Sequence, residues 1–269
     1  MIDRIPAVAG TFYPKEQFQL KALLKDFFEE KMELSFLKQN VGLILPHAGY
    51  IYSAKTAAFA ISKLKDFGKP KTVILIGPNH TGIGKGTFSI WDKGKWITPF
   101  GDFAVDTKLA AFLIENNPFI VPDYSSHIAE HSLEVQIPIL SYFLGSFKIV
   151  PILVNNQSYE NVLKLTKTLK EIWEVEKSLL FVASSDMNHY ESEDITLQKD
   201  TKLIEKILEK DIKGMYEIAL KYNISACGIG PIASIIPLFE NVKLIHHTTS
   251  ADISGDSFHT VGYASFLLW

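Results

Sequence analysis

Three of the eight histidines follow closely on apolar segments that are typical of buried β-strands. These are His47 after Val41–Leu45, His80 after Thr72–Ile76 and His189 after Ser178–Ala183. Ligands of open α/β sheets bind at the carboxyl ends of the strands, where the connecting loops meet. Since neutral imidazole is the commonest protein ligand for metals, the pattern predicts one metal site at this edge of a sheet.

Cys227 is the only cysteine and the candidate third donor. It lies in a Gly-rich turn before a predicted helix, where the dipole and the free N–H groups favour a thiolate. A lone cysteine excludes an internal disulfide and a structural zinc site built from several cysteines. Two chemical roles stay open, a metal ligand and a nucleophile with His189 as its base. The third interpretation is a small buried apolar side chain.

Asp186 and His189 stand three residues apart after the third strand. They form a candidate acid–base pair beside the metal, in which His189 moves a proton and Asp186 sets the tautomer of the imidazole. The alternative is that Asp186 only caps the next turn.

The segment around Glu130, His131 and Glu134 resembles a helical metal motif. The residues from His127 to His131 match the short inverted zinc pattern H-x-x-E-H, which is a weak signal. We therefore expect Glu130 or Glu134 to orient a ligating histidine rather than bind the metal. His246, His247 and His259 are assigned to structure or surface.

The strands that position these residues are predicted by short apolar runs between turn residues. Besides the three named above, they are Phe119–Val121, Phe147–Val154, Val242–His247, Val261–Leu268, and a hairpin of Thr87–Trp91 with Lys95–Thr98 around Asp92-Lys93-Gly94. The last two strands are expected to pair antiparallel, which would make the sheet mixed.

The helices are predicted by apolar residues at a spacing close to 3.6 and by capping residues. They are Lys15–Lys31, Ser53 to Phe67, Asp106 to Glu115, Ser125 through Tyr142 with Pro138 at a kink or in a first turn, Ser158 to Trp173, Ile195–Leu208, Asp211–Tyr222, and Pro231 to Phe239. Alternating strands and helices predict one three-layer α/β/α domain over residues 1–269, with a mixed, mainly parallel central sheet.

The composition excludes several classes of function. A net charge of −3 with dispersed basic residues leaves no footprint for nucleic acid. The sequence has no apolar run long enough to span a membrane and no signal peptide at its start, so we expect a cytoplasmic protein without membrane contact.

Taken in order, six motifs resemble the Memo family, called AmmeMemoRadiSam system protein B in prokaryotes. They are Leu45-Pro46-His47-Ala48-Gly49-Tyr50, Gly77-Pro78-Asn79-His80, Glu130-His131-Ser132-Leu133-Glu134, Ser184-Ser185-Asp186, His189 and Cys227-Gly228. The opening Ala9-Gly10-Thr11-Phe12-Tyr13 and the closing Val261-Gly262-Tyr263-Ala264 fit as well, so the resemblance spans essentially the whole chain.

The resemblance implies a fold related to the class III extradiol dioxygenases, which use non-haem Fe(II). It places His47 and His80 at the two iron-binding histidines, Cys227 where those enzymes have a glutamate ligand, and His189 at the catalytic acid–base, with Asp186 lining the pocket. It implies iron or copper as the metal, and AMMECR-type and radical SAM proteins as partners. Animal members are associated with phosphotyrosine peptides and cell motility.

Three functions remain in view. The leading one is a redox-active metalloprotein with Fe(II), or copper or zinc in its place, acting on an undefined small molecule or protein. The second is a zinc-dependent hydrolase with His189 or Glu130 as base. The third is a non-catalytic peptide-binding module with a vestigial dioxygenase-like pocket, although a phosphate pocket should carry arginine and the chain has only Arg4.

Overall fold

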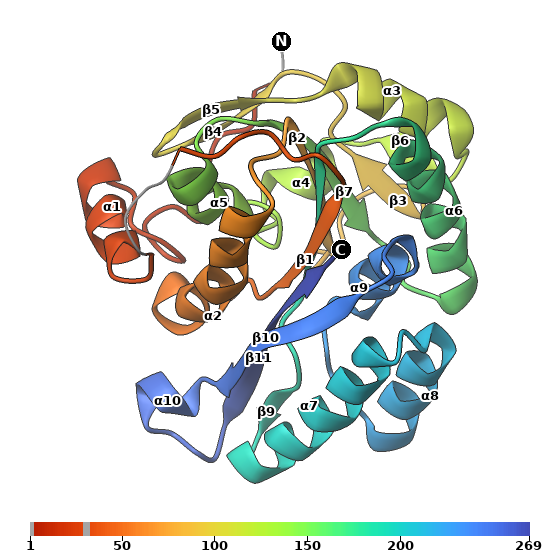
Figure 1. The fold of residues 1–269 in the computed structure, drawn as a ribbon. Coiled ribbons are helices and arrows are strands. Elements are labelled where there is room, and N and C mark those ends of the chain that lie inside the picture. The colour runs from red at the N-terminus through yellow and green to blue at the C-terminus, as the bar shows by residue number, and fades with distance from the viewer. Residues whose placement is uncertain (1–2, 29–32) are drawn as a thin grey trace.

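The computed structural model describes residues 3–28 and 33–269. Within them, nine strands form one sheet between helices (Figure 1). Its order is β10 (Val242–Thr249), β11 (Thr260–Leu268), β1 (Val41–Leu45), β8 (Leu179–Ser184), β2 (Thr72–Pro78), β7 (Lys148–Val154), β3 (Phe88–Ile90) and β6 (Ile120–Pro122), and β9 (His189–Glu191) pairs with β11. A separate hairpin joins β4 (Lys95–Thr98) to β5 (Gly101–Ala104).

Four neighbouring strands at the centre of the sheet, β1, β8, β2 and β7, run parallel. Every residue of β1, β2 and β8 is buried, as expected for a sheet covered on both faces. β11 pairs antiparallel with β1 and β10, and β3 pairs antiparallel with β7. The predicted α/β fold with a mixed, mainly parallel sheet is therefore confirmed.

Helices cover both faces of the sheet (Figure 1). The helices are α1 (Gln17–Lys25), α2 (Tyr50–Ser62), α3 (Thr107–Asn116), α4 (Ser125–Ile128), α5 (Gln136–Leu144), α6 (Tyr159–Val175), α7 (Glu193–Leu208), α8 (Ile212–Tyr222), α9 (Ile229–Ile235) and α10 (Ala251–Ser254), with short 3₁₀ turns at Lys63–Asp66 and Ile236–Leu238. α2 packs on β1, β11 and α5, whereas α9 packs on β8, β2 and α6. α7 lies against β10 and β11.

Several predicted boundaries are confirmed. Asp106 caps α3 through a bond from Leu109 N, and Asp211 caps α8 through Gly214 N. The two closing strands pair antiparallel. Each of these elements has a local signal, a cap or an alternating apolar pattern, that needs no distant partner.

The predicted hairpin of Thr87–Trp91 with Lys95–Thr98 is wrong. Residues 88–90 are fully buried and pair with β7 and β6 in the main sheet. Strand β4 pairs instead with β5, across a turn in which Gly101 has a φ of +120°. Residues 88–90 stay in the main sheet because their backbone N–H and C=O groups are paired by β7 on one side and β6 on the other.

The predicted long helix from Ser125 to Tyr142 is also wrong, because residues 129–135 leave the helix between α4 and α5. The Glu130 side chain accepts the N–H groups of His131 and Ser132, both at 2.9 Å. Arg4 binds the carbonyls of His127 and Glu130 at 2.8 and 2.7 Å. These side chains take the backbone groups that a continuous helix would pair with each other.

Three other helix ends differ from the predicted ones. α1 ends at Lys25 rather than Lys31, and residues 29–31 lie outside the described residues. α2 begins at Tyr50, whose N–H binds Phe12 O, and Ser53 lies inside its first turn with its hydroxyl on Ala48 O. α9 begins at Ile229, so Pro231 is its third residue, still in the first turn where its missing N–H breaks no bond.

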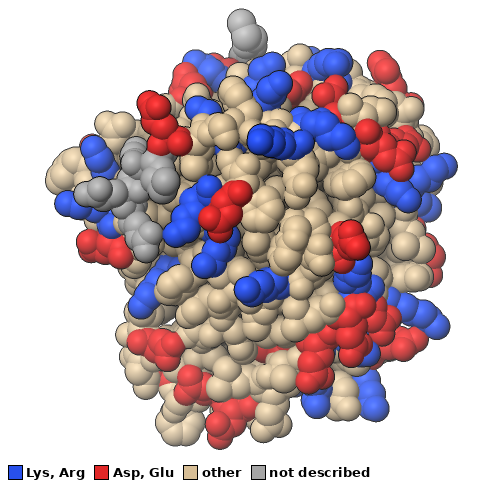
Figure 2. Space-filling model, viewed as in Figure 1, with Lys and Arg blue, Asp and Glu red and all other residues tan. Residues whose placement is uncertain are grey.

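Charges are interspersed over the face that Figure 2 shows, with lysines and carboxylates side by side. No helix of the described residues is long and apolar enough to cross a membrane.

Candidate metal centre

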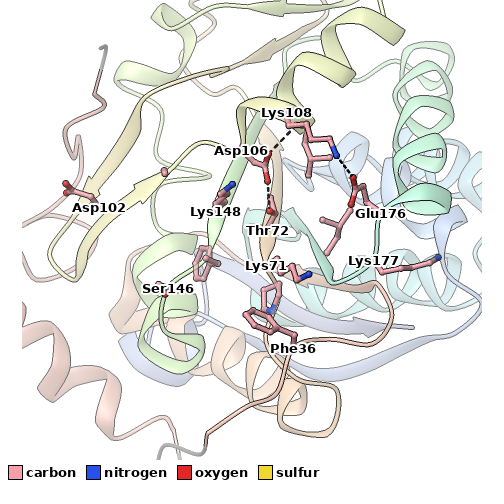
Figure 3. A pocket seen from close by; sticks show the side chains of 15 residues that line it. Phe36, Lys71, Thr72, Asp102, Asp106, Lys108, Ser146, Lys148, Glu176 and Lys177 are labelled. Atoms are coloured by element: carbon pink, nitrogen blue, oxygen red, sulfur yellow. Dashed lines mark hydrogen bonds and ion pairs between the residues drawn. The ribbon is translucent and has the colours of Figure 1, made fainter.

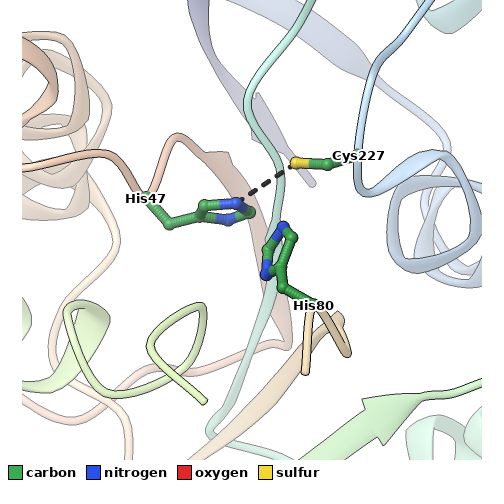
Figure 4. Close-up of side chains that lie close together, drawn as sticks. All are labelled: His47, His80 and Cys227. Carbon is green, nitrogen blue, oxygen red and sulfur yellow. Dashed lines mark hydrogen bonds between the residues drawn. The ribbon is translucent and has the colours of Figure 1, made fainter. Parts of the chain in front are cut away.

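His47, His80 and Cys227 converge from three separate loops (Figure 4). His47 follows β1, His80 follows β2, and Cys227 stands in the turn before α9. One ligand atom from each lies within 4.8 Å of the other two. The Sγ of Cys227 is 3.2 Å from Nε2 of His47, and the two imidazole rings are 5.1 Å apart. The structure therefore brings together the three residues predicted to bind metal.

The Cys227 turn is fixed by close packing against the end of β8. The N–H of Gly228 donates to Ser185 Oγ at 2.9 Å. A Cβ on Gly228 would lie 2.3 Å from the Ser184 carbonyl oxygen, so no larger residue fits there without movement. Gln157 donates to Cys227 O and accepts from Gly230 N, both at 2.8 Å. These contacts hold the sulfur against the first histidine.

The tautomer of His47 follows from its hydrogen-bond partner. Nδ1 of His47 lies 2.8 Å from Ser184 Oγ. That hydroxyl donates its one proton to Ser132 O at 2.7 Å and also accepts from Gln136 Nε2. Ser184 Oγ must therefore accept from His47, which places the proton on Nδ1 and leaves the Nε2 lone pair facing Cys227.

His80 is held in the same way by a carboxylate. Glu130 Oε1 accepts from Nδ1 of His80 at 2.9 Å, and Oε2 accepts the main-chain N–H of the same residue at 2.5 Å. Burial opposes ionisation of Glu130, yet the hydrogen bonds from His80 and Ser132 lower its pKa to about 2. A carboxylate that fixes Nδ1–H is the usual support of a metal-binding histidine.

His131 lies beside the two histidines. Its ring stacks on His80 at 4.6 Å and is 5.4 Å from His47, while its Nδ1 is 3.3 Å from Glu130 Oε1. His80, Glu130 and His131 form a second group of close donor atoms. Burial lowers the pKa of His131, so a neutral imidazole faces the centre.

Asp186 and His189 lie at the same end of the sheet but do not pair as expected. Asp186 Oδ1 accepts the N–H of His47 at 2.7 Å, and its own N–H points at Cys227 Sγ, 3.3 Å away. Nδ1 of His189 donates to the carbonyl of Ser225 at 3.0 Å. The expectation that Asp186 sets the tautomer of His189 is wrong, because a main-chain carbonyl does so.

Burial governs ionisation at this centre. It holds the pKa of His47 well below its usual value and lowers that of His189. It raises the pKa of Asp186 to about 7, and it raises the pKa of the Cys227 thiol, to which the Asp186 charge adds. A buried thiol of this kind is a poor nucleophile by itself, whereas a bound cation would favour its thiolate form.

The Glu134 carboxylate makes no hydrogen bond or ion pair to a histidine among the residues that the structure describes. Its carboxylate pairs with Arg4 at 2.7 Å and accepts from Tyr13 Oη at 2.8 Å and from the main chain of Ala7 and Val8. All of these partners belong to the N-terminal arm, more than 120 residues away. Nothing in the local sequence separates this glutamate from Glu130.

The other histidines take no part in the cluster. His127 is buried with Nε2 on Ser89 O, so the H-x-x-E-H string does not form a joint site. His246 contacts Thr56 and His247 pairs with Asp200. Four residues that hold the centre were not identified from the sequence: Ser184, Gln136, Gln157 and Ser225. Only Ser184 had a recognisable sequence signal, a hydroxyl at the end of a buried strand.

Comparison with known proteins gives one consistent match. A family model described as Memo-like protein matches residues 4–267. A MEMO1 family protein of Thermotoga petrophila is 39% identical over 278 residues, covering 100% of both chains. A MEMO1 family protein of Pyrobaculum arsenaticum is 41% identical over 276 residues, covering 98% of each. The crystal structure of an uncharacterized Escherichia coli protein superposes with a TM-score of 0.60 over 85% of this chain and 99% of that one. At 11% identity, that likeness shows the fold alone.

Proposed function

The chain belongs to the Memo-like protein family, and on that premise we propose that it is a redox metalloprotein in which His47, His80 and Cys227 hold non-haem iron(II). One observation carries the proposal. Both histidines have Nδ1 committed to a protein acceptor, Ser184 Oγ or Glu130 Oε1. Each therefore keeps its Nε2 lone pair for an outside partner beside the Cys227 sulfur, an arrangement that fits a metal ion.

The donor set supports a transition metal rather than magnesium or calcium. Two neutral imidazoles and a thiolate are soft or intermediate ligands that suit iron, copper and zinc. A cation also offsets the cost of a negative sulfur in a buried site. When bound, iron(II) would supply one-electron redox chemistry.

The residues around the three donors have separate tasks in this proposal. His189 presents Nε2 as a proton acceptor, since its Nδ1–H is held by the Ser225 carbonyl. Asp186 positions His47 by binding its main-chain N–H. His131 adds a neutral imidazole that stacks on His80, with its Nδ1 3.3 Å from Glu130 Oε1. A substrate would meet both imidazoles, one from β9 and one from the segment before α5.

Metal content of anaerobically purified protein tests the proposal directly. We expect close to one iron per chain in the wild type and large losses in His80→Ala and Cys227→Ser. His259→Ala is the matched control, because that side chain is exposed and its one ion-pair partner among the described residues is Asp256. Full iron occupancy in Cys227→Ser would show that the Cys227 sulfur is not a metal ligand. Zinc instead of iron, under expression with balanced metals, would favour the hydrolase.

His189→Gln separates proton transfer from metal binding. Iron should stay bound, because Nε2 of His189 is not one of the three donors that converge. Loss of iron in this variant would make His189 a ligand and refute its assignment as proton acceptor. A protein that keeps iron but does not react with any oxidant or reductant would instead favour the non-catalytic module.

Partners and location stay predictions. We propose AMMECR-type and radical SAM proteins as partners on the strength of the family alone, and co-purification with tagged versions of both would test them. A cytoplasmic location, which keeps the single thiol reduced, is proposed with them.

A further inference from the structure

A cavity of about 630 Å³ lies at the opposite edge of the sheet from the histidines. Thr72, Lys148 and Leu179 line it, and each stands at the amino end of its strand, in β2, β7 and β8. The candidate donors His47 and His80 follow the carboxyl ends of β1 and β2, and Cys227 lies beside His47. Figure 3 shows the cavity between the β4–β5 hairpin, the start of α3 and the residues that follow α6. It is therefore a separate site.

Apolar side chains form the floor of this cavity. Leu109, Phe147 and Leu179 line it and are almost fully buried. Phe36 also lines it, yet 52% of its surface is exposed. The backbone of Phe36 is bridged to Lys69, so the ring is presented from a fixed main chain. An exposed aromatic ring on a fixed backbone can stack on a flat ligand.

The carboxylates that line the cavity already have partners within the protein. Asp102 pairs with Lys95 at 2.5 Å, and Glu176 pairs with Lys108 at 3.2 Å. Asp106 is occupied by the Thr72 hydroxyl at 2.8 Å and by the N-terminus of α3. These acidic groups therefore do not neutralise the other cations at the rim.

Three lysines at the rim, Lys71, Lys148 and Lys177, have no carboxylate within ion-pair distance in the part of the chain that the structure describes. All three are exposed. Lys71 Nζ lies 5.8 Å from the centre of the Phe36 ring, so a positive charge and an aromatic face stand side by side. An anion bound here would meet the ammonium groups of Lys71, just before β2, and of Lys148 in β7. Lys177 Nζ turns instead to the ring and carbonyl of Trp173.

We propose that this cavity binds a small organic anion, with a phosphate or carboxylate group held by Lys71 and Lys148 and a flat apolar body against Phe36. An open hollow of this volume has room for a small molecule. Its apolar floor and the cationic groups at its rim match a ligand that has an apolar part and an anionic part. The proposal is independent of the proposed function, because no lining residue touches the metal cluster.

Calorimetric titration with 1-naphthyl phosphate tests the proposal on the full-length metal-bound protein. We expect saturable binding at sub-millimolar concentration, at least tenfold tighter than 1-naphthol or inorganic phosphate alone, because only the complete probe uses both parts of the cavity. Lys71→Gln and Lys148→Gln should each weaken binding about threefold, as for an exposed charge pair, and the double variant about tenfold. Lys170→Gln is the matched control, an exposed lysine of α6 that does not line the cavity.

Three results would overturn the proposal. One is unchanged affinity in the double lysine variant, and another is equal binding of neutral 1-naphthol. The third is loss of binding in His80→Ala, which would show that the phosphate had bound at the metal centre. Binding that persists in His80→Ala supports the separate site, whether or not the protein holds iron.

Discussion

Glu130→Gln tests how far one carboxylate builds the metal centre. Glu130 accepts from the Nδ1 and the main-chain N–H of His80 and from the main chain of His131 and Ser132. A carboxamide has the same shape but only one acceptor oxygen. The less costly orientation puts the NH₂ at the place of Oε2, opposite the N–H of His80, and leaves the other oxygen to its three donors.

The size of the effect follows from these contacts. A buried N–H without an acceptor costs about 1–3 kcal/mol, and loss of the charge roughly halves the strength of the remaining bonds. We expect the free energy of unfolding to fall by about 3 kcal/mol. Because supports of ligating histidines contribute 10- to 100-fold to metal affinity, iron binding should weaken by about 30-fold.

Glu134→Gln is the matched control, four residues along the same segment. It breaks the buried pair with Arg4, which should lower the free energy of unfolding by about 3–5 kcal/mol. Its carboxylate contacts no histidine among the described residues, so metal affinity should change less than about twofold. Urea denaturation of the metal-free proteins and competition with a chromophoric chelator measure the two quantities. Wild-type affinity in Glu130→Gln, or an equal loss in Glu134→Gln, would refute the reasoning.

Three further predictions concern burial and packing. Burial lowers the pKa of His127 to about 3, below its unfolded value near 6.5, so the unfolded chain takes up the proton first. Stability of the metal-free protein should therefore fall as the pH drops from about 6.5 towards 3, by at most about 1.4 kcal/mol per unit. His127→Phe should show a shallower slope in urea denaturation at pH 7, 5.5 and 4, and parallel slopes would contradict this. Gly228→Ala places a Cβ 2.3 Å from Ser184 O and should lower stability by about 1–3 kcal/mol and weaken iron binding. Gly255→Ala is strained by its φ of +73° but has no atom within 4 Å of the added Cβ, so it should lower stability without loss of metal. Iodoacetamide should alkylate Cys227 much more slowly in the metal-bound than in the metal-free protein, and equal rates would place the sulfur outside the site.

The fold was predictable where local patterns decide the structure. β1, β2 and β8 are short, mostly apolar runs, which are typical of strands in a sheet covered on both faces. α3 and α8 carry aspartate caps that act on their own first turns. The β4–β5 hairpin was not predicted, because residues 88–90 pair instead with strands from distant parts of the chain. The local sequence does not indicate which strands they pair with.

The convergence of His47, His80 and Cys227 was predictable because each residue stands just past a strand end or in a Gly-rich turn. The topology alone brings His47 and His80 to one edge, since β1 and β2 run parallel with β8 between them. Among the supporting contacts, the bond from His80 to Glu130 agrees with the expectation that Glu130 or Glu134 orients a histidine, but the contact that holds His189 was not predictable. Ser225 holds His189 through a main-chain carbonyl, and any residue could supply that group.

Glu130 and Glu134 show why motif spacing alone could not assign roles here. On a continuous helix, residues four apart share one face, and both carboxylates would then serve the same histidine. The helix is interrupted between them, because Arg4 takes the carbonyl of Glu130 while the Glu130 side chain takes the N–H groups of the next two residues. One carboxylate is thereby turned to His80 and the other to the guanidinium of Arg4. The N-terminal arm and the candidate metal centre are therefore anchored to the same short segment through different groups: Arg4 binds the Glu134 carboxylate and the Glu130 carbonyl, whereas His80 binds the Glu130 carboxylate.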